Sequence, residues 1–166
     1  MAQNVRVLDF DVNRCVGCHA CETACKMENL VVTGPKWIQV IQKEVPREDG
    51  GWTVVFMPLN CRHCNDPVCV AVCPARAIQK QANGIVSIDA NKCIGCTECL
   101  QACPFGAPQF GPSGTMQKCN MCEHRVSKGL PTACEQLCPV GAIKSGTAIE
   151  LSVLTREKYL MTTIGG

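Results

Sequence analysis

The chain has 166 residues, a formal net charge of +2 and sixteen cysteines, but only two Trp, one Tyr and four Phe. The small charge and the lack of a dense Lys/Arg cluster exclude nucleic-acid binding as the main function. No apolar run approaches the roughly 18 residues that a membrane-spanning helix needs. So few aromatic residues cannot fill a large conventional core, and we expect something other than side chains to fill the middle of the fold.

A secreted disulfide framework is the first alternative, because the cysteine count is even. The N-terminus MAQNVRVLDFDVNRC has no basic region followed by an apolar stretch, as a secretory signal would have. A mature chain could have lost such a signal, so the spacing of the cysteines has to decide.

The first predicted element is a cysteine loop, CVGCHACETAC, with Cys15, Cys18, Cys21 and Cys25. The spacing C-x2-C-x2-C lets one loop supply three ligands to a metal–sulfur core. A fourth cysteine, after three more residues, falls on a turn or short helix that leads away. In bacterial two-cluster ferredoxins this fourth cysteine binds the neighbouring cluster. The spacing therefore predicts a cross-link between two metal centres.

The next predicted element is a β-hairpin. Polar and apolar residues alternate over 37–42 and 52–57, on either side of a polar turn at 48–51. We expect Trp37 and Trp52 to cover one another or the outer pair of clusters, with a role in partner binding as the alternative.

Two further cysteine groups follow, CRHCNDPVCVAVCP and CIGCTECLQACP. The stretch between them has the form of one short ferredoxin, with a helix start at Cys73-Pro74, a turn at Asn83-Gly84 and a strand over 85–88. Groups two and three therefore form one local unit. Group four, CNMCEHRVSKGLPTACEQLCP, repeats the CPARAI of group two as CPVGAI, which indicates a duplicated unit. Groups one and four are left to form the second unit, with the first inserted between them.

We infer four cubane [4Fe–4S] clusters, each held by three cysteines of one group and the fourth cysteine of the group paired with it. The predicted ligand sets are Cys15, Cys18 and Cys21 with Cys138; Cys119, Cys122 and Cys134 with Cys25; Cys61, Cys64 and Cys69 with Cys103; and Cys93, Cys96 and Cys99 with Cys73. Zinc is the alternative, although zinc sites usually join two C-x2-C pairs across a longer gap.

The duplicated units predict an α+β fold class: two bacterial-ferredoxin-like modules, one inserted into the other, with a small irregular core built around iron–sulfur clusters and an added β-hairpin. The outer module comprises residues 1–57, including the hairpin, and 104–145, and the inserted module comprises 58–103. The tail, 146–166, has loosely helical apolar spacing. It predicts a helix that either packs back on the body or docks another subunit.

Other polar residues lie beside the cysteines. In Rieske centres, histidines replace two of the cysteine ligands. Here all four cysteines of every group are present, so we expect His19, His63 and His124 to pack and to form hydrogen bonds instead. Backbone N–H groups of the loops at Gly17 and Gly95 are expected to point towards sulfur. Single basic residues beside cysteines are interpreted, for the most part, as ordinary solvated side chains. These residues are Arg14, Lys26, Arg62, Arg76, Lys92, Lys118 and Lys144.

Four motifs are typical of one family: CVGCHACETACK, NCRHCNDPVCVAVCP, DANKCIGCTECLQACPFGA and KCNMCEHR…ACEQLCPVGAI. Over roughly residues 4–145 the chain resembles the four-cluster ferredoxin-type subunits of multisubunit redox enzymes, such as those of the dimethyl sulfoxide reductase and formate dehydrogenase type. Short relatives accompany hydrogenases, carbon monoxide dehydrogenases and tungsten aldehyde oxidoreductases.

The resemblance implies a cytoplasmic electron conduit between a large catalytic subunit and a second acceptor subunit or a ferredoxin. The short length favours a tungsten- or molybdenum-containing aldehyde or formate oxidoreductase as the catalytic partner. Two alternatives stay open: a free polyferredoxin that shuttles electrons between enzymes, and a self-associating chain that stacks into a longer conductor. No nucleotide loop, acid/base constellation or open cluster corner indicates an enzyme.

Overall fold

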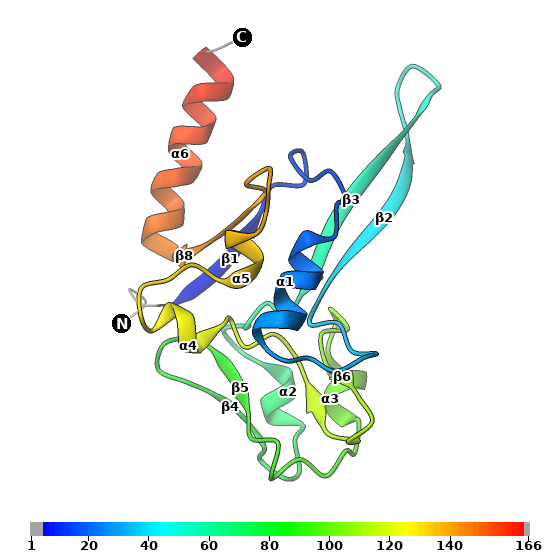
Figure 1. The fold of residues 1–166 in the computed structure, drawn as a ribbon, viewed down its shortest axis with the longest axis vertical. Coiled ribbons are helices and arrows are strands. Elements are labelled where there is room, and N and C mark those ends of the chain that lie inside the picture. Colours follow the sequence, from blue (N-terminus) through cyan, green and yellow to red (C-terminus); the bar gives the residue numbers. More distant parts are fainter. Residues whose placement is uncertain (1–4, 165–166) are drawn as a thin grey trace.

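A computed structural model describes residues 5–164 as short helices and four small antiparallel sheets (Figure 1). The strands are β1 (Arg6–Phe10), β2 (Ile38–Pro46), β3 (Trp52–Asn60), β4 (Ile78–Lys80), β5 (Val86–Ile88), β6 (Gln109–Phe110), β7 (Met116–Gln117) and β8 (Ile143–Thr147). The helices are α1 (Ala20–Glu28), α2 (Val68–Ala71), α3 (Glu98–Ala102), α4 (Glu123–Val126), α5 (Ala133–Gln136) and α6 (Ala148–Ile164). Residues 1–4 and 165–166, which the predicted outer module and tail include, lie outside the described residues.

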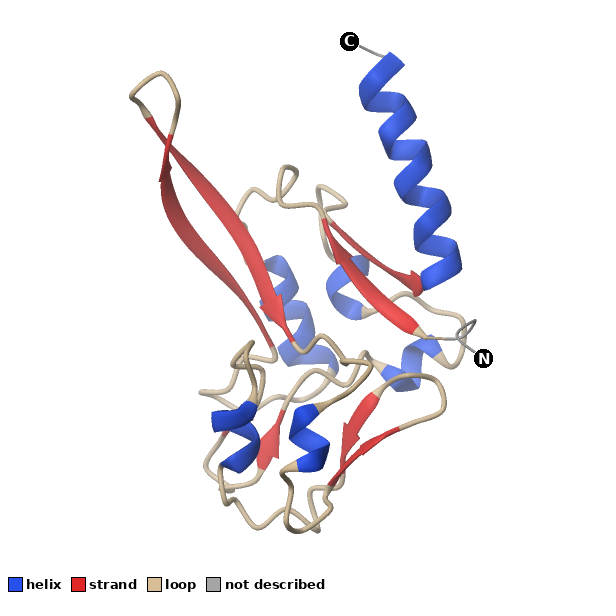
Figure 2. Cartoon of the chain, turned by 180° about the vertical axis from the view of Figure 1, so that it is seen from behind, coloured by secondary structure: helices blue, strands red, loops and turns tan. Residues whose placement is uncertain are grey.

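The two ends of the described chain meet in one sheet. Strand β1 pairs antiparallel with β8, and Phe10 lies opposite Ile143. Leu8 and Ile143 are buried on this sheet, which packs near α1 and α5 in the middle of the molecule. In both ribbon views, α2, α3, β4, β5 and β6 gather at one end, and the β2–β3 hairpin and α6 project from the other (Figures 1 and 2).

The predicted hairpin is confirmed, with longer strands than expected. Ile38 pairs with Asn60 at the base and Pro46 pairs with Trp52 at the far end. Near the base, Ile38 and Val40 are buried, but Trp52 is 68% exposed. The expectation that the two tryptophans cover one another is therefore wrong, because Trp37 precedes the base and Trp52 lies at the tip. Trp37 packs instead against the core that contains the cysteines of groups one and four.

The residue after the fourth cysteine distinguishes helices α1 and α3. Helix α1 continues through Cys25, which is followed by Lys26, whereas α3 ends directly before Cys103, which has an extended conformation (φ −80°, ψ 114°). A residue before proline avoids the helical region, and Pro104 follows Cys103. The predicted helix start at Cys73-Pro74 is wrong. Helix α2 lies before Cys73, and the chain turns directly after it.

The buried side chains form small clusters that include cysteines. The first contains Cys21, Cys25 and Cys134 with apolar residues from the β1–β8 sheet, the hairpin base and α4, and the second contains Cys99 with Ile78, Val86 and Met116. Met116 comes from the segment 104–145 of the predicted outer module but packs with the inserted one. The nested ferredoxin-like arrangement and its bounds stay a prediction.

The predicted tail forms the helix α6, whose first turns contact β8 and β1. Leu151 is buried there, but Ile149, Val153 and Leu154 are exposed, and the helix extends away from the body (Figure 1). Docking of another subunit on α6 stays a prediction. Within residues 5–164, no helix has both the length and the apolar character that crossing a lipid bilayer requires.

Candidate metal centres

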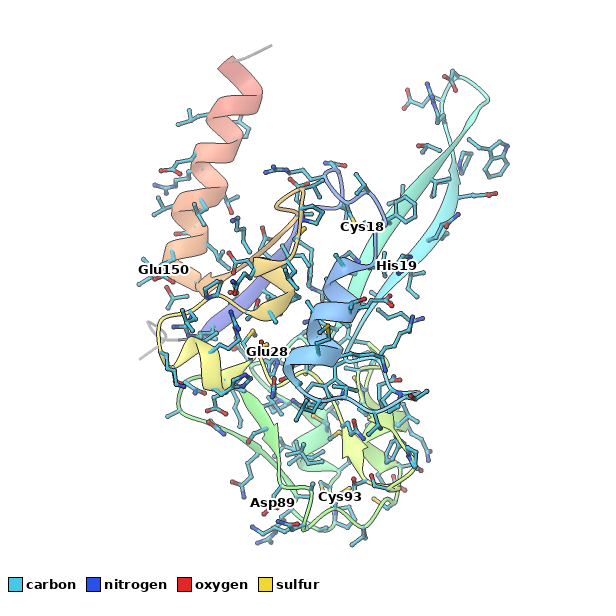
Figure 3. The ribbon with its side chains drawn as sticks, in the orientation of Figure 1. Cys18, His19, Glu28, Asp89, Cys93 and Glu150 are labelled. Atoms are coloured by element: carbon cyan, nitrogen blue, oxygen red, sulfur yellow. The ribbon has the colours of Figure 1, made fainter. Side chains whose placement is uncertain are left out.

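Four cavities are lined by four cysteines each, and each combines three cysteines of one group with one of another. Site I contains Cys15, Cys18, Cys21 and Cys138; site II contains Cys61, Cys64, Cys69 and Cys103; site III contains Cys93, Cys96, Cys99 and Cys73; and site IV contains Cys119, Cys122, Cys134 and Cys25. These are the sets expected from the spacing. Cys93 of site III lies near one end of the molecule, and Cys18 of site I lies far from it, on the side of the body from which the hairpin and α6 project (Figure 3).

All sixteen cysteines, which lie within the described residues, are free thiols, so the disulfide framework finds no support. Among residues 5–164, no three His, Cys, Asp or Glu side chains come close enough together to hold a single metal ion. Four zinc ligands would converge at about 2.0–2.3 Å from one point. The cysteines instead surround a space, and this donor set of four thiolates with apolar walls fits a polynuclear iron–sulfur cluster.

Left-handed glycines shape two of the cysteine loops. Gly17 (φ +68°) and Gly95 (φ +71°) occupy the same position in groups one and three. A Cβ atom on Gly17 would lie 2.5 Å from Cδ1 of Phe56, and one on Gly95 would lie 2.7 Å from the carbonyl oxygen of Gly114. Both glycines therefore let the cysteine loop approach a neighbouring segment closely.

Backbone N–H groups do point towards cysteine sulfur, but from positions other than those expected. Ala77 and Ala142 donate to the sulfur of the cysteine four residues before each of them, at 3.3 and 3.2 Å. Met121 donates to Cys119 at 3.4 Å. The donors found among residues 5–164 do not include Gly17 or Gly95. Such hydrogen bonds stabilise the extra negative charge of a reduced cluster.

Burial raises the pKa of several of these thiols. The pKa of Cys119 reaches about 12, and those of Cys99 and Cys134 reach about 11; neighbouring cysteines raise these pKa values further, and hydrogen bonds to the sulfurs oppose the shift. These thiols keep their protons near neutral pH unless a metal displaces them, so cluster binding releases protons.

The repulsions between thiolates also indicate which sites are neighbours. Repulsion from Cys69 of site II contributes to the raised pKa of Cys99 of site III. Cys61 of site II acts in the same way on Cys119 of site IV, and Cys21 of site I acts on Cys134 of site IV. Packing joins two of these pairs of sites: Cys69 packs against the buried cluster that contains Cys99, and Cys21 and Cys134 lie together in another. The sites therefore follow one another in the order III, II, IV, I.

A buried polar pair lies between sites II and IV. Lys118 is 3% exposed, lines site II, and donates to the carbonyl oxygens of Val86 and Cys119. His63 accepts the N–H of Val86 at Nδ1, over 3.0 Å. Burial, with nearby Lys118 and Lys80, lowers the pKa of His63 to about 3, so the ring is neutral. The expectation that basic residues beside cysteines are solvated is therefore wrong for Lys118. The expected hydrogen bonding of His63 is confirmed.

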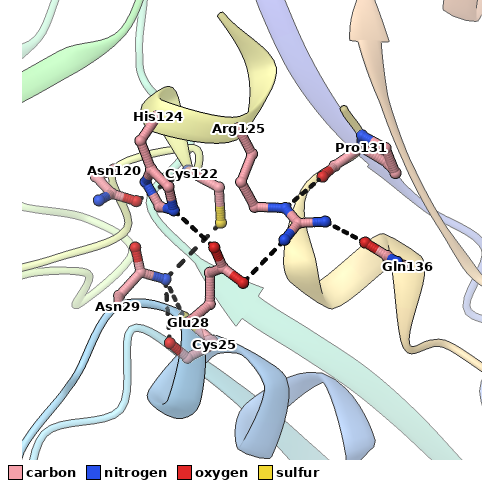
Figure 4. Close-up of polar contacts among 9 residues, drawn as sticks. All are labelled: Cys25, Glu28, Asn29, Asn120, Cys122, His124, Arg125, Pro131 and Gln136. Atoms are coloured by element: carbon pink, nitrogen blue, oxygen red, sulfur yellow. Dashed lines mark hydrogen bonds and ion pairs between the residues drawn. The ribbon is translucent and has the colours of Figure 1, made fainter. Parts of the chain in front are cut away.

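The other two histidines form the expected hydrogen bonds as well. His19 lies 3.1 Å from Glu22 in the first turn of α1. His124 lies 2.7 Å from Glu28 at the end of α1, and Figure 4 shows Glu28 between His124 and Arg125. The contacts of Glu28 join the helix of group one to the helix of group four.

Three residues beside site IV were not predicted from the sequence: Asn29, Asn60 and Thr132. Each has a polar side-chain atom within 4 Å of a cysteine sulfur. Their signal in the sequence is weak. Asn60 directly precedes Cys61 but contacts a cysteine of another group, and Asn29 lies one turn after Cys25.

Comparisons with known proteins agree with this geometry. Residues 52–148 match a family described as "4Fe-4S dicluster domain", and residues 14–77 match a second family with the same description. The thiosulfate reductase electron transfer subunit PhsB of Salmonella typhi is 38% identical over 153 residues, which cover 90% of this chain and 80% of that protein.

Two further relatives have related names. One chain of the anaerobic dimethyl sulfoxide reductase of Escherichia coli is 36% identical over 150 residues, covering 86% of this chain and 73% of that protein. A subunit of the tetrathionate reductase of Salmonella typhimurium is 40% identical over 135 residues, covering 80% of this chain and 54% of the relative. The chain therefore belongs to the 4Fe–4S dicluster family, as an electron-transfer subunit with four [4Fe–4S] clusters and no catalytic role of its own.

Proposed function

We propose that sites I to IV each hold one [4Fe–4S] cluster and that paired groups exchange their fourth cysteines. One observation carries this proposal: Cys25 lines site IV and not site I, although it belongs to the same motif as Cys15. Cys138 lines site I in return. Exchange of this kind ties residues distant in the sequence to one inorganic core, which suits a chain with few aromatic residues. It also supports two nested ferredoxin-like modules.

The order of the sites gives the proposed path of the electrons. Sites II and IV lie in the interior of the series, and sites I and III lie at its ends. Cys18 of site I and Cys96 of site III are exposed. An electron enters near one of these residues, passes through the two inner sites and leaves near the other. The chain then needs a redox partner at each end.

For the first partner we propose a large catalytic oxidoreductase subunit with a molybdenum or tungsten centre. The relatives are named after reductases of thiosulfate, tetrathionate and dimethyl sulfoxide. These names favour a reductase of a sulfur compound over an aldehyde or formate oxidoreductase. A second subunit or a ferredoxin serves the other end. We propose a cytoplasmic location, since sixteen unpaired thiols suit a reducing compartment.

Analysis of the purified chain tests the cluster proposal directly. Four [4Fe–4S] clusters give about 16 iron and about 16 acid-labile sulfide per chain. Cys138→Ser should then alter the spectroscopic signal of the cluster bound by group one, and Cys25→Ser that of the cluster bound by group four. The exchange is wrong if each variant alters only the cluster of its own group.

Isolation from the native source tests the partner. Co-purification with a large molybdenum- or tungsten-bearing chain supports the proposal. A monomer that purifies alone supports the free polyferredoxin, and a homo-oligomer in mass photometry supports the self-stacking alternative.

A further inference from the structure

Site IV differs from the other sites in its side chains. Each of its four cysteine sulfurs has a polar side chain within hydrogen-bonding distance. The amide nitrogen of Asn29 lies 3.8 Å from Cys25 Sγ and 3.8 Å from Cys122 Sγ, that of Asn60 lies 3.9 Å from Cys119 Sγ, and the hydroxyl of Thr132 lies 3.4 Å from Cys134 Sγ. Figure 4 shows the amide of Asn29 between Cys122 and Cys25, and the carbonyl oxygen of Cys25 also accepts a hydrogen bond from this amide, over 3.0 Å.

The other three sites lack this feature within the described part of the chain. Their cysteine sulfurs accept hydrogen bonds from backbone N–H groups, such as those of Ala77 in site III and Ala142 in site I. Site IV has the backbone donor Met121 in addition to its side chains. The number of donors around the sulfurs is therefore largest at site IV.

These side chains are held in place by burial. Thr132 is 1% exposed and Asn60 is 5% exposed. The side-chain oxygens of Asn29 and Asn60 are buried and, among residues 5–164, have no hydrogen-bond partner. The N–H₂ of Asn29 also donates to the carbonyl oxygen of Cys25, whereas the hydrogen bond found for the N–H₂ of Asn60 is the one to sulfur. An amide such as that of Asn60, with its oxygen unsatisfied and its N–H₂ directed at sulfur, is stabilised only if that sulfur is a good acceptor, as a metal-bound thiolate is. Thr132 must likewise donate, because a thiolate has no proton to give.

Two effects on the reduction potential oppose one another at site IV. Burial disfavours the additional negative charge of the reduced state, which lowers the potential. Hydrogen bonds to the sulfurs stabilise that charge and raise the potential. Site IV has more hydrogen bonds to its sulfurs than the other sites, so the second effect is expected to be largest there.

We propose that Asn29, Asn60 and Thr132 give site IV the highest reduction potential of the four sites. The inference rests on the cluster ligation proposed above. Reduction adds one electron and neither forms nor breaks a covalent bond, and the three donors respond only by stronger hydrogen bonds. The electron then rests at an inner position of the series, between the exposed ends at sites I and III.

A reductive titration with dithionite and mediators, followed by electron paramagnetic resonance, tests the proposal on the wild-type chain. The site IV signal is the one that Cys122→Ser alters or removes. We expect this signal to appear first as the potential falls. Its appearance after the signal of any other site would overturn the proposal, whether or not any further variant folds.

Two nearly isosteric variants test the named residues. Asn60→Leu and Thr132→Val remove one donor each, and each should lower the ratio of reduced to oxidised site IV about tenfold at a fixed potential, or about 59 mV for one electron. Thr132→Ser should restore the wild-type value. Asn91→Leu, at an exposed asparagine near group three, is the matched control and should shift no signal.

Iron content separates the possible failures. If the wild type holds about 16 irons and Cys122→Ser affects one signal, the proposed ligation stands. Unchanged potentials in iron-complete Asn60→Leu and Thr132→Val would then overturn only the role of the donors. A low iron content in the wild type, or four intact signals in Cys122→Ser, would overturn the ligation as well.

Discussion

Arg125 in α4 donates from Nη1 to Oε2 of Glu28 at the end of α1, over 2.9 Å. His124 lies 2.7 Å from the other oxygen of the same carboxylate. The two helices belong to groups one and four, and each brings a cysteine to site IV: Cys25 lies in α1, and Cys122 caps α4. Glu28 therefore joins, through protein atoms alone, the same two segments that the proposed cluster joins through iron.

Replacing Glu28 with glutamine should weaken this connection. The hydrogen bond with His124, supported by Arg125, lowers the pKa of Glu28, so the carboxylate is ionised in the neutral range. We expect Glu28→Gln to lose its clusters modestly faster on heating at pH 7, as measured by bleaching of the visible absorbance. Glu48→Gln, in the exposed hairpin turn, is the control. Equal bleaching rates in the two variants would contradict the prediction.

Glu22 connects α1 to the hairpin and gives a pH-dependent prediction. The carboxylate is 8% exposed and accepts hydrogen bonds from Lys36 and from the backbone N–H of Val40, both at 2.7 Å. Burial alone would raise the pKa of Glu22, but these donors and His19 outweigh it, and the pKa is lowered. The stabilisation is therefore complete above the usual carboxyl pKa of about 4.3 and is lost as the pH falls through the lower folded value.

We expect Glu22→Gln to cost about 1–3 kcal/mol at pH 7, because a charged hydrogen-bond partner is lost. The rate of cluster loss in urea, compared between wild type and variant, measures this difference. The gap between the two rates should narrow as the pH falls below about 4. A gap that stays constant from pH 7 to pH 3 would mean that the charge of Glu22 contributes nothing.

Gly17 tests how closely the first cysteine loop approaches the hairpin. Gly17→Ala places a methyl group 2.5 Å from Cδ1 of Phe56 and adds the strain of a left-handed alanine. Gly50→Ala is a matched control, because a Cβ atom on Gly50 (φ +81°) would have nothing within 4 Å and would incur only the strain, about 1 kcal/mol. We expect Gly17→Ala to cost about 1–3 kcal/mol more, owing to overpacking. Equal rates of thermal bleaching would show that the ring moves aside freely.

Short-range spacing predicted the cysteine loops and the hairpin, because both depend on residues close together in the sequence. The same spacing could not predict that β1 pairs with β8, since Phe10 and Ile143 meet only after the whole chain has folded. The helix expected after Cys73 is absent because the chain turns there and enters β4 at Ile78, which pairs with β5. Local pattern thus indicated the ligands but not the contacts between distant segments.

The side chains that surround the cysteine ligands could not be predicted from short-range sequence patterns either. Lys92 and Lys118 each precede a C-x2-C motif, but Lys92 is exposed and Lys118 is buried between two sites. Asn60 directly precedes Cys61 of site II and contacts the sulfur of Cys119 in site IV. Which site a side chain serves depends on how the segments pack, and no spacing rule contains that information.

Lys118 provides the last prediction. Its buried ammonium group donates to carbonyl oxygens, which carry no net charge, so the negative clusters proposed for sites II and IV are what compensate its charge. Lys118→Gln keeps an amide donor but removes that charge, and adding an electron at either site becomes harder. We expect the reduction potentials of sites II and IV both to fall in a potentiometric titration. At a fixed potential, the ratio of reduced to oxidised cluster should drop about tenfold at each site.

The control is Lys92→Gln, which removes a solvent-screened charge beside Cys93 and should leave all four potentials nearly unchanged. If Lys118→Gln lowers the potential of only one site, the ammonium group compensates that cluster alone. If Lys118→Gln and Lys92→Gln shift the potentials equally, burial does not make the charge of Lys118 more effective.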